Sequence, residues 1–336
     1  MLTTPHETRS HLRTLAPGAG VAGGAVVLAM LVNLLVPALS PAVVAVAAGA
    51  ALASLAGVGE RLRPGLAFVS RRVLRVAIAL LGLQIAVPQV LALGWQSLAV
   101  VAVATGVTFA VTPVIGRRLG LSRGTSLLIA TGVSICGAAA IAAMRESTDL
   151  PDDEEAAASA LGVVVLYGTA SIALIPLLAS LLGLSPAELG VWTGAAVHEV
   201  AQVAAIGAAS GVLAVAVTVK LGRVVLLAPI VALTSYRSRT ASPSDRPEAG
   251  RRPPVVPLFV LAFLAMVAVR STGLVPASVT GALPAVTNVL MAAALFGLGT
   301  GIDVRKLVRG GRAALLGGIA TAIIAVTSLA GVALLV

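Results

Sequence analysis

Apolar runs long enough to cross a lipid bilayer recur along almost the whole chain, from Val21 to Val336. Only 11% of the residues are charged, against about 25% in a typical soluble protein. The runs are continuous, whereas a transmembrane β-barrel would show short alternating segments. The sequence therefore predicts an all-α polytopic membrane protein, and a soluble protein with a large core is the minor alternative.

Turn residues and charge clusters divide the apolar sequence into about eleven predicted transmembrane helices. Under this division the basic segments 61–75, 117–123, 237–252 and 305–312 fall on one side of the membrane, and the acidic segment 149–155 falls on the other. Basic loops mark the cytoplasmic side. We therefore expect a multi-pass protein of the plasma (inner) membrane with a cytoplasmic N-terminus and an outside C-terminus. The formal net charge of +10 is then a topology signal, and no nucleic-acid partner is expected.

Two short similarities indicate an internal repeat. Arg72–Val76 opens the third span and Lys220–Val224 opens the eighth with the same base-x-x-Arg-Val spacing, which favours inverted repeats of the kind that secondary transporters use. A second similarity relates Thr131–Ala143 to Thr193–Ala205, but as whole spans these would run parallel, so we rank it lower. The predicted organisation is a cytoplasmic tail (1–20), an extra first helix (21–41), repeat one of spans two to six (42–183), and repeat two of spans seven to eleven (184–336) with a mobile cytoplasmic linker (237–254).

The apolar run from Gly190 to Val224 contains polar and ionisable side chains. A charge at the centre of a transmembrane helix costs about 2.5–3.5 kcal/mol, so such groups usually pair or line a polar path. We expect His198, Glu199 and Gln202 to couple transport to protons or sodium, because His198 titrates near neutral pH and shares a helix face with Gln202. A purely structural ion pair of Glu199 with Lys220 or Arg223 is the alternative.

Two glycine-rich segments predict interrupted helices near the bilayer midplane. Glycine weakens a helix, and a free helix N-terminus attracts anions. Close helix packing through small residues is the alternative in both segments, and Cys136 is more simply a packing residue than a nucleophile. The predicted substrate-binding residues are Ser134, Ile135, Cys136 and Gly137 in span five, Leu298, Gly299, Thr300 and Gly301 in span ten, and the cations Lys220 and Arg223 in span eight.

The sequence offers little support for an enzyme or a metalloprotein. His198 and Glu199 are followed by Val-Ala-Gln, so the HExxH zinc motif is absent. The chain has no Gly-x-Ser-x-Gly elbow, phosphate-binding loop or dinucleotide fingerprint, and its single cysteine excludes an intrachain disulfide. We therefore expect no enzymatic activity, no cofactor and no metal.

Four segments resemble the YeiH-type membrane proteins, a family usually labelled as sulfate exporters. They are SICGAAAIAA (134–143), VHEVAQVAAIG (197–207), KLGRV (220–224) followed by LLAP (226–229), and ALFGLGTGID (294–303). The likeness extends from about Pro64 to the end of the chain. The family is thought to be related to bile-acid transporters and sodium/proton antiporters. This relation implies two inverted five-helix repeats whose discontinuous helices, here spans five and ten, cross at the substrate site.

The function that we expect is secondary active transport of a small anion, such as sulfate or a sulfonate, by alternating access. Half-helix amides of the glycine segments would hold the anion, and His198 or Glu199 would couple its movement to protons or sodium. A cation/proton antiporter built on Glu199 and a non-transporting membrane scaffold are the alternatives. The expected partners are the anion, the coupling ion and the lipid bilayer, and a homodimer stays open.

Overall fold

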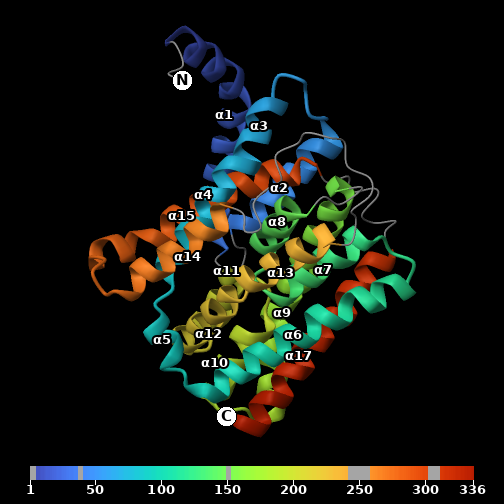
Figure 1. Cartoon of the computed structure of the whole chain (residues 1–336), viewed down its shortest axis with the longest axis vertical. Helices are drawn as coiled ribbons and strands as arrows, with labels where there is room; N and C mark the ends of the chain where they lie inside the picture. The colour runs from blue at the N-terminus through green and yellow to red at the C-terminus, as the bar shows by residue number, and fades with distance from the viewer. Residues whose placement is uncertain (1–4, 37–40, 149–152, 241–257, 302–310) are drawn as a thin grey trace. The chain divides into compact units, whose positions relative to one another are not determined.

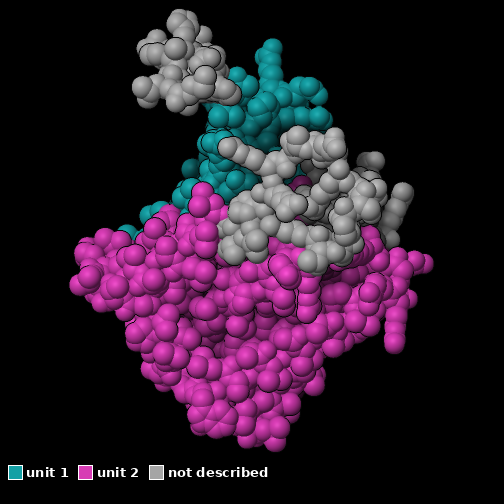
Figure 2. All heavy atoms as spheres, viewed as in Figure 1, with its two compact units in different colours: residues 1–77, 282–309 teal, residues 78–281, 310–336 magenta. Residues whose placement is uncertain are grey.

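The computed structural model describes residues 5–36, 41–148, 153–240, 258–301 and 311–336, and all the regular structure in them is helical. Six helices in these ranges are long and apolar enough to cross a membrane, judged by length and composition. This agrees with the predicted all-α polytopic class. The chain divides into two compact units, coloured separately in Figure 2: unit 1 comprises residues 1–77 and 282–309, and unit 2 comprises residues 78–281 and 310–336.

Unit 1 is built from the N-terminal helices and the end of α15. Its elements are α1 (Pro5–Leu35), α2 (Pro41–Leu55), α3 (Arg63–Phe68), the π-helix η1 (Val69–Val73), the first residues of α4 (Leu74–Leu81) and the later part of α15 (Ala277–Gly299). The predicted cytoplasmic tail is not a separate segment, because α1 runs through it from Pro5. Glycines let α1 and α3 approach closely, and a Cβ added to Gly65 would lie 2.7 Å from Gly18 Cα.

Helix α15 ends at Gly299, inside the segment where the sequence predicted a break in span ten. Helix α15 is continuous to Gly299, and the Thr300 N–H still makes a helical hydrogen bond of 3.1 Å. The glycines also serve close packing, since a Cβ added to Gly297 would lie 2.9 Å from Leu66 O. Residues 302–310 lie outside the described ranges, so the broken helix at Leu298–Gly301 stays a prediction.

Unit 2 contains the remaining helices, and α17 lies antiparallel beside α6 in it (Figure 1). A Cβ added to Gly116 would lie 2.9 Å from Leu316, and one added to Gly331 would lie 3.0 Å from Val100. The elements of unit 2 are the end of α4, the 3-10 helix η2 (Gly82–Gln84), α5 (Val87–Leu91), α6 (Gly94–Arg118), α7 (Arg123–Ser134), α8 (Ala138–Ser147), α9 (Asp153–Leu182), α10 (Pro186–Ala196), α11 (Val200–Ala209), α12 (Leu213–Val225), α13 (Leu227–Thr240), α14 (Leu258–Ser271), the start of α15, and α17 (Gly311–Leu335).

Helices α12 and α13 follow one another as a nearly continuous rod. The positions of the other elements of unit 2 are described relative to this rod. Its membrane-length part, Leu213–Arg237, has 25 residues. At about 1.5 Å per residue this is about 37 Å, enough to cross a hydrocarbon core of about 30 Å. Arg237 lines a cavity together with Arg117 and Arg123, so we call this end of the rod the basic end. We call the opposite end, at Leu213, the far end.

Helices α7 and α8 form a hairpin that begins and ends at the basic end of the rod. Arg123, the first residue of α7, lines a cavity together with Thr234. The last residue of α8, Ser147, accepts a hydrogen bond of 3.1 Å from Ser235 Oγ through its carbonyl oxygen. Between these points the hairpin tip contacts Arg223, near the middle of the rod. The chain therefore enters from the basic end and returns to it.

Helices α10 and α11 form a second hairpin, which begins and ends at the far end. A Cβ added to Gly190 in α10 would lie 3.0 Å from Val215, and one added to Gly207 in α11 would lie 2.8 Å from Leu213 Cα. The tip of this hairpin contacts Lys220, again near the middle of the rod. The two hairpins thus enter unit 2 from opposite ends and meet halfway.

The sequence predicted that spans five and seven each cross the membrane, span five with a break at its glycines, whereas in the structure each of them forms a hairpin. Hydropathy counts any apolar run of about 20 residues as a crossing, and a turn in its middle leaves no trace beyond a glycine or a few polar residues. The acidic segment 149–155 was expected opposite the bases, yet Ser147, just before it, lies at the basic end. Residues 149–152 themselves lie outside the described ranges.

The hairpins bear on the two internal similarities found in the sequence. Arg72 is exposed whereas its predicted counterpart Lys220 is fully buried, so the similarity that defined the predicted repeats does not extend to their environments. The segments Thr131–Ala143 and Thr193–Ala205 contain the turns of the two hairpins, which enter unit 2 from opposite ends. The predicted repeats 42–183 and 184–336 do not coincide with the compact units, and they remain a prediction.

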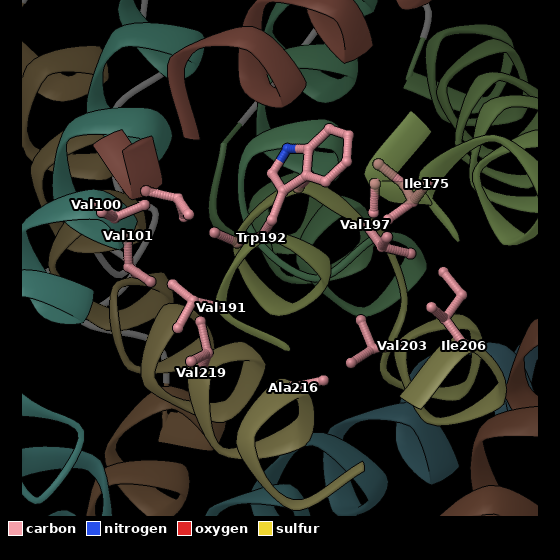
Figure 3. Packing of buried hydrophobic residues seen from close by; sticks show 14 residues of the cluster. Val100, Val101, Ile175, Val191, Trp192, Val197, Val203, Ile206, Ala216 and Val219 are labelled. Atoms are coloured by element: carbon pink, nitrogen blue, oxygen red, sulfur yellow. The ribbon is translucent and has the colours of Figure 1, made fainter. Parts of the chain in front are cut away.

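The α10–α11 hairpin is packed into an apolar cluster of unit 2. Trp192 of α10, which is 1% exposed, lies among side chains of α6, α9, α11, α12 and α17, most of them labelled in Figure 3. Its indole N–H donates to Ala325 O at 2.9 Å, which satisfies the one polar atom of a side chain with a large apolar surface. This packing holds the entering arm of the hairpin against α17.

Candidate functional site

The tip of the first hairpin consists of residues 135–137. Helix α7 starts at the N-cap Ser122, whose side chain accepts a backbone hydrogen bond of 3.1 Å, and ends at Ser134. Gly137 follows with φ 72° and ψ −132°, a conformation that residues with a Cβ rarely adopt. A Cβ added there would also lie 2.7 Å from Glu199 Cγ. Glycine at position 137 therefore allows both the turn and the approach of the second hairpin.

The tip of the second hairpin consists of residues 197–199, between two capped helices. Ser185 and Glu188 form a capping box at the start of α10. A second capping box starts α11: the Glu199 carboxylate accepts from the Gln202 backbone N–H, and Gln202 Oε1 accepts from the Glu199 N–H at 3.1 Å. Reciprocal capping of this kind satisfies two backbone donors that a helix leaves open. The HEVAQ motif is therefore a helix start inside the protein.

Lys220 of α12 joins the two tips through their backbone carbonyls. Its Nζ donates to Ile135 O and to Val197 O, both at 2.7 Å, and the side chain is fully buried. The last carbonyls of a helix have no partner within it and carry partial negative charge. Lys220 therefore neutralises the C-terminal ends of α7 and α10 together.

Arg223, one turn further along α12, makes the same connection with more bonds. Its Nε donates to Ser134 O at 2.6 Å, and its Nη2 donates to Val133 O. Its Nη1 donates to Ala195 O at 2.7 Å and to Val197 O at 2.9 Å. Lys220 and Arg223 were predicted to bind substrate, but these donors bind the backbone of the protein itself. Their positive charge remains in the site.

Glu199 contacts both hairpins as well. Besides capping α11, its carboxylate accepts a hydrogen bond from the backbone N–H of Ala138, the first residue of α8. A direct ion pair with Lys220 or Arg223, the structural alternative considered above, does not occur among the described residues. The carboxylate therefore lies at the N-terminal ends of two helices, where the helix dipoles favour a negative charge.

Several buried polar atoms around the tips have no hydrogen-bond partner among the described residues. Leaving a buried polar atom unpaired costs about 1–3 kcal/mol, and each such case calls for an explanation such as a bound ligand or water. Together the atoms offer a hydroxyl, an amide donor, an imidazole nitrogen and a carboxylate oxygen to a small ligand. They are Ser134 Oγ, Thr193 Oγ1, His198 Nδ1, Glu199 Oε2 and Gln202 Nε2.

Two residues beside the tips were not found from the sequence. Thr321 of α17 lies with its Oγ1 3.0 Å from His198 Nε2. Gly168 of α9 lies directly against the Gln202 side chain, so that a Cβ there would meet the amide. An isolated threonine or glycine in an apolar helix carries no signal of its own, and only the fold brings these residues to the site.

The other predicted residues are distributed as follows. Cys136 is buried at the first tip, next to Ile135. Leu298–Gly301 lie at the end of α15 in unit 1, whereas the site described here is made entirely of residues from unit 2. Across the described ranges, no three His, Cys, Asp or Glu side chains cluster in a way that could hold a metal ion.

Comparison with known proteins gives a consistent set of relatives. The profile of the family described as conserved hypothetical protein 698 matches residues 17–318. A UPF0324 membrane protein of Corynebacterium glutamicum is 43% identical over 303 residues, which cover 89% of this chain and 86% of the relative. One from Bradyrhizobium diazoefficiens is 36% identical, with 82% and 79% covered. The UPF0324 membrane protein TauZ of Paracoccus denitrificans is 36% identical, with 80% of each chain covered.

No solved structure matches the chain. The sequence matches extend over both hairpins and the rod, and they confirm the resemblance to the YeiH-type proteins. The chain therefore belongs to the UPF0324 family of membrane proteins, the family also described as conserved hypothetical protein 698.

Proposed function

We propose that the chain is a secondary active transporter of a small anion, and that the two hairpin tips hold the cargo between them. The observation that carries the proposal is the meeting of two oppositely inserted hairpins at buried polar atoms without partners. A site halfway along a membrane-length rod suits alternating access, because displacing one hairpin would open it toward one end only.

The charge balance of the tips favours an anion. With Lys220 and Arg223 protonated, Glu199 ionised and His198 neutral, the side chains at the tips carry one net positive charge. The helix ends contribute nothing net, because the C-terminal ends of α7 and α10 and the N-terminal ends of α8 and α11 each carry about half a charge. Ser134 Oγ and Gln202 Nε2 could donate hydrogen bonds to the bound anion.

A sulfonate or sulfate is the first candidate for the cargo. Both carry oxygen atoms that accept hydrogen bonds from hydroxyl, amide and backbone N–H donors of the kind present at the tips. The name TauZ, which the Paracoccus denitrificans relative carries, hints at taurine, a sulfonate. His198 and Glu199 are the candidates for coupling to protons or sodium, because both have an unpartnered polar atom in the site.

A cation/proton antiporter is the second candidate, favoured by the unpartnered Glu199 Oε2. The two candidates differ in what drives flux, which proteoliposomes containing the purified full chain can resolve. For the anion transporter, labelled sulfate or taurine should accumulate under an imposed gradient. A flux that follows sodium and protons without any dependence on these anions would identify the antiporter and refute the anion proposal.

Glu199→Gln tests the coupling role against a matched control. Glu188 caps α10 at the exposed base of the same hairpin, so Glu188→Gln makes the same chemical change away from the tips. We expect Glu199→Gln to reduce coupled uptake by more than about tenfold, whereas Glu188→Gln leaves it unchanged, with both variants folded by size-exclusion chromatography. Equal uptake by the two variants would remove Glu199 from the mechanism.

The same proposal places the protein in the plasma membrane. The basic end then faces the cytoplasm. Arg117, Arg123 and Arg237 gather at this end, and Arg312 Nη1 lies 3.2 Å from a Cβ added to Gly120. Helix α17 starts there, so the C-terminus would be outside. In unit 1 the start of α1 lies beside the basic segment before α3, which would make the N-terminus cytoplasmic.

Cysteine labelling distinguishes this arrangement from eleven simple crossings. With two hairpins, Glu188→Cys should react with a membrane-impermeant maleimide on intact cells, and Glu155→Cys should react only after permeabilisation. With eleven crossings, Glu155→Cys should instead react on intact cells, and Glu188→Cys should react only after permeabilisation. The unmodified chain serves as the blank, because its single cysteine, Cys136, is buried.

A further inference from the structure

A cavity of about 210 Å³ lies at the basic end of unit 2, away from the hairpin tips. It lies between α6, α7 and α13, and its apolar wall includes Phe109, Pro113 and Leu127. The arginines Arg117 and Arg123 also line it and have exposed side chains. Along the rod its wall is about 11 residues from Arg223, or roughly 17 Å at 1.5 Å per residue, so it is a separate site.

The chemistry of the wall favours an anion that also carries hydrocarbon. Ser126 and Thr234 line the cavity, but their hydroxyls already donate to Ser122 O at 2.9 Å and to Ile230 O at 2.8 Å. The arginines therefore supply the positive charge and the available donors. A bare hydrated anion would lose water against the apolar wall without replacement hydrogen bonds, which is unfavourable. An anion with an attached apolar group would satisfy both the arginines and the wall.

Helix α6 also carries an exposed apolar stripe on the face next to the one that lines the cavity. Val103, Val107, Val111 and Val114 are all exposed, and their spacing of three or four residues places them along one side of the helix. The stripe ends one turn before Arg117. The cavity itself is smaller than the roughly 300–1,000 Å³ of sites that enclose a drug-sized ligand. It therefore fits only part of an amphiphile, and the stripe offers a surface for the rest.

We propose that this cavity binds the headgroup of an anionic phospholipid. Arg117 and Arg123 contact the phosphate, for which the planar guanidinium is well shaped. The carbons next to the phosphate lie against Phe109 and Leu127, and an acyl chain follows the valine stripe. Basic cavities between helices at a membrane surface are suited to such headgroups. Because α7 begins at Arg123, the lipid connects the base of the first hairpin to α6.

Lipid titrations of the purified full chain, followed by native mass spectrometry, test the proposal. We expect phosphatidylglycerol to bind at least about tenfold more tightly than phosphatidylcholine. Replacing Arg117 or Arg123 by alanine should weaken phosphatidylglycerol binding by about fivefold each, the effect of one basic residue near a membrane surface. Arg72→Ala is the control, since Arg72 is an exposed arginine of η1 that neither lines the cavity nor lies on the valine stripe.

Two further measurements separate a lipid from a free anion. Val111→Ser should weaken binding of long-chain phosphatidylglycerol but leave a short-chain form that cannot reach the stripe unaffected. Inorganic phosphate or sulfate at millimolar concentration should not displace the lipid. Displacement by these ions would make the cavity a free-anion site and overturn the lipid assignment. Equal binding of the two lipids, or an equal loss in Arg72→Ala, would overturn it as well. Neither result bears on transport at the hairpin tips.

Discussion

Replacing Arg223 by methionine should destabilise the protein more than any other single change at the tips. Methionine keeps a flexible side chain of comparable length, so the main loss is the guanidinium and its hydrogen bonds to four backbone carbonyls. Of these carbonyls, Val197 O also accepts from Lys220 and keeps a partner. Val133 O, Ser134 O and Ala195 O lose the donor that Arg223 provides.

The magnitude follows from the number of carbonyls that lose a donor. A buried carbonyl without its partner costs about 1–3 kcal/mol, so three of them give about 3–9 kcal/mol. The chain unfolded in a membrane also finds partners for its polar groups, which lowers the effect toward the bottom of that range. We expect a loss of about 3–5 kcal/mol in the free energy of unfolding, in the lower half of that range.

Lys220→Met provides the internal comparison. This substitution removes the ammonium group that donates to Ile135 O and Val197 O. Val197 O keeps its hydrogen bond from Arg223, so only Ile135 O loses the donor that it has here. The expected loss is therefore about 1–3 kcal/mol, clearly smaller than for Arg223→Met. Arg118→Met, an exposed cation in the same unit, should change stability by less than about 0.5 kcal/mol.

Equilibrium unfolding in mixed micelles, followed by tryptophan fluorescence, measures all three variants. Trp192 is 1% exposed and Trp95 67% exposed, so a change of environment on unfolding reports chiefly on the second hairpin. The reasoning fails if Lys220→Met costs as much as Arg223→Met, because the number of donors lost would then not set the stability. It also fails if Arg223→Met is as stable as Arg118→Met.

Two glycine substitutions test the packing of the site. Gly137→Ala should lower stability by about 1–3 kcal/mol, because φ 72° with ψ −132° is a conformation open essentially to glycine. It should also reduce anion uptake, because the new Cβ would lie 2.7 Å from Glu199 Cγ. Gly120→Ala, with φ 72° but away from the tips, should lower stability without the transport loss. Gly168→Ala should displace the Gln202 amide and weaken anion binding, measured by isothermal titration calorimetry, whereas Gly106→Ala, which has open space around it, should leave the affinity unchanged.

The sequence predicts the chemistry of this protein better than its topology. Composition and apolar runs identify the membrane class, and the cost of buried charge singles out His198, Glu199, Lys220 and Arg223. The structure does bring these four residues together with Ser134 in one site. Such a prediction succeeds because an unpaired charge in lipid is too costly to occur without a specific environment.

The topology was harder to predict, for a physical reason. A helix that crosses the membrane and a hairpin that returns halfway can have the same length, apolarity and end residues. They differ only in the backbone at the tip, where Gly137 has φ 72°. The glycines of span ten are ambiguous for a similar reason, since Gly297 and Gly299 make close contacts within unit 1, and the pairing of spans five and ten stays a prediction. Whether a small residue ends a helix or admits a neighbour depends on long-range contacts that one sequence does not display.

The bonds from α12 are divided equally between the two hairpins, and this bears on how the proposed transporter could work. The first hairpin receives bonds at Val133, Ser134 and Ile135. The second hairpin receives one at Ala195 and two at Val197. Alternating access needs the states open to either side to have similar free energies, because a large difference would trap one of them. Moving either hairpin alone breaks three bonds to the same two cations, so opening toward the basic end and opening toward the far end carry similar costs.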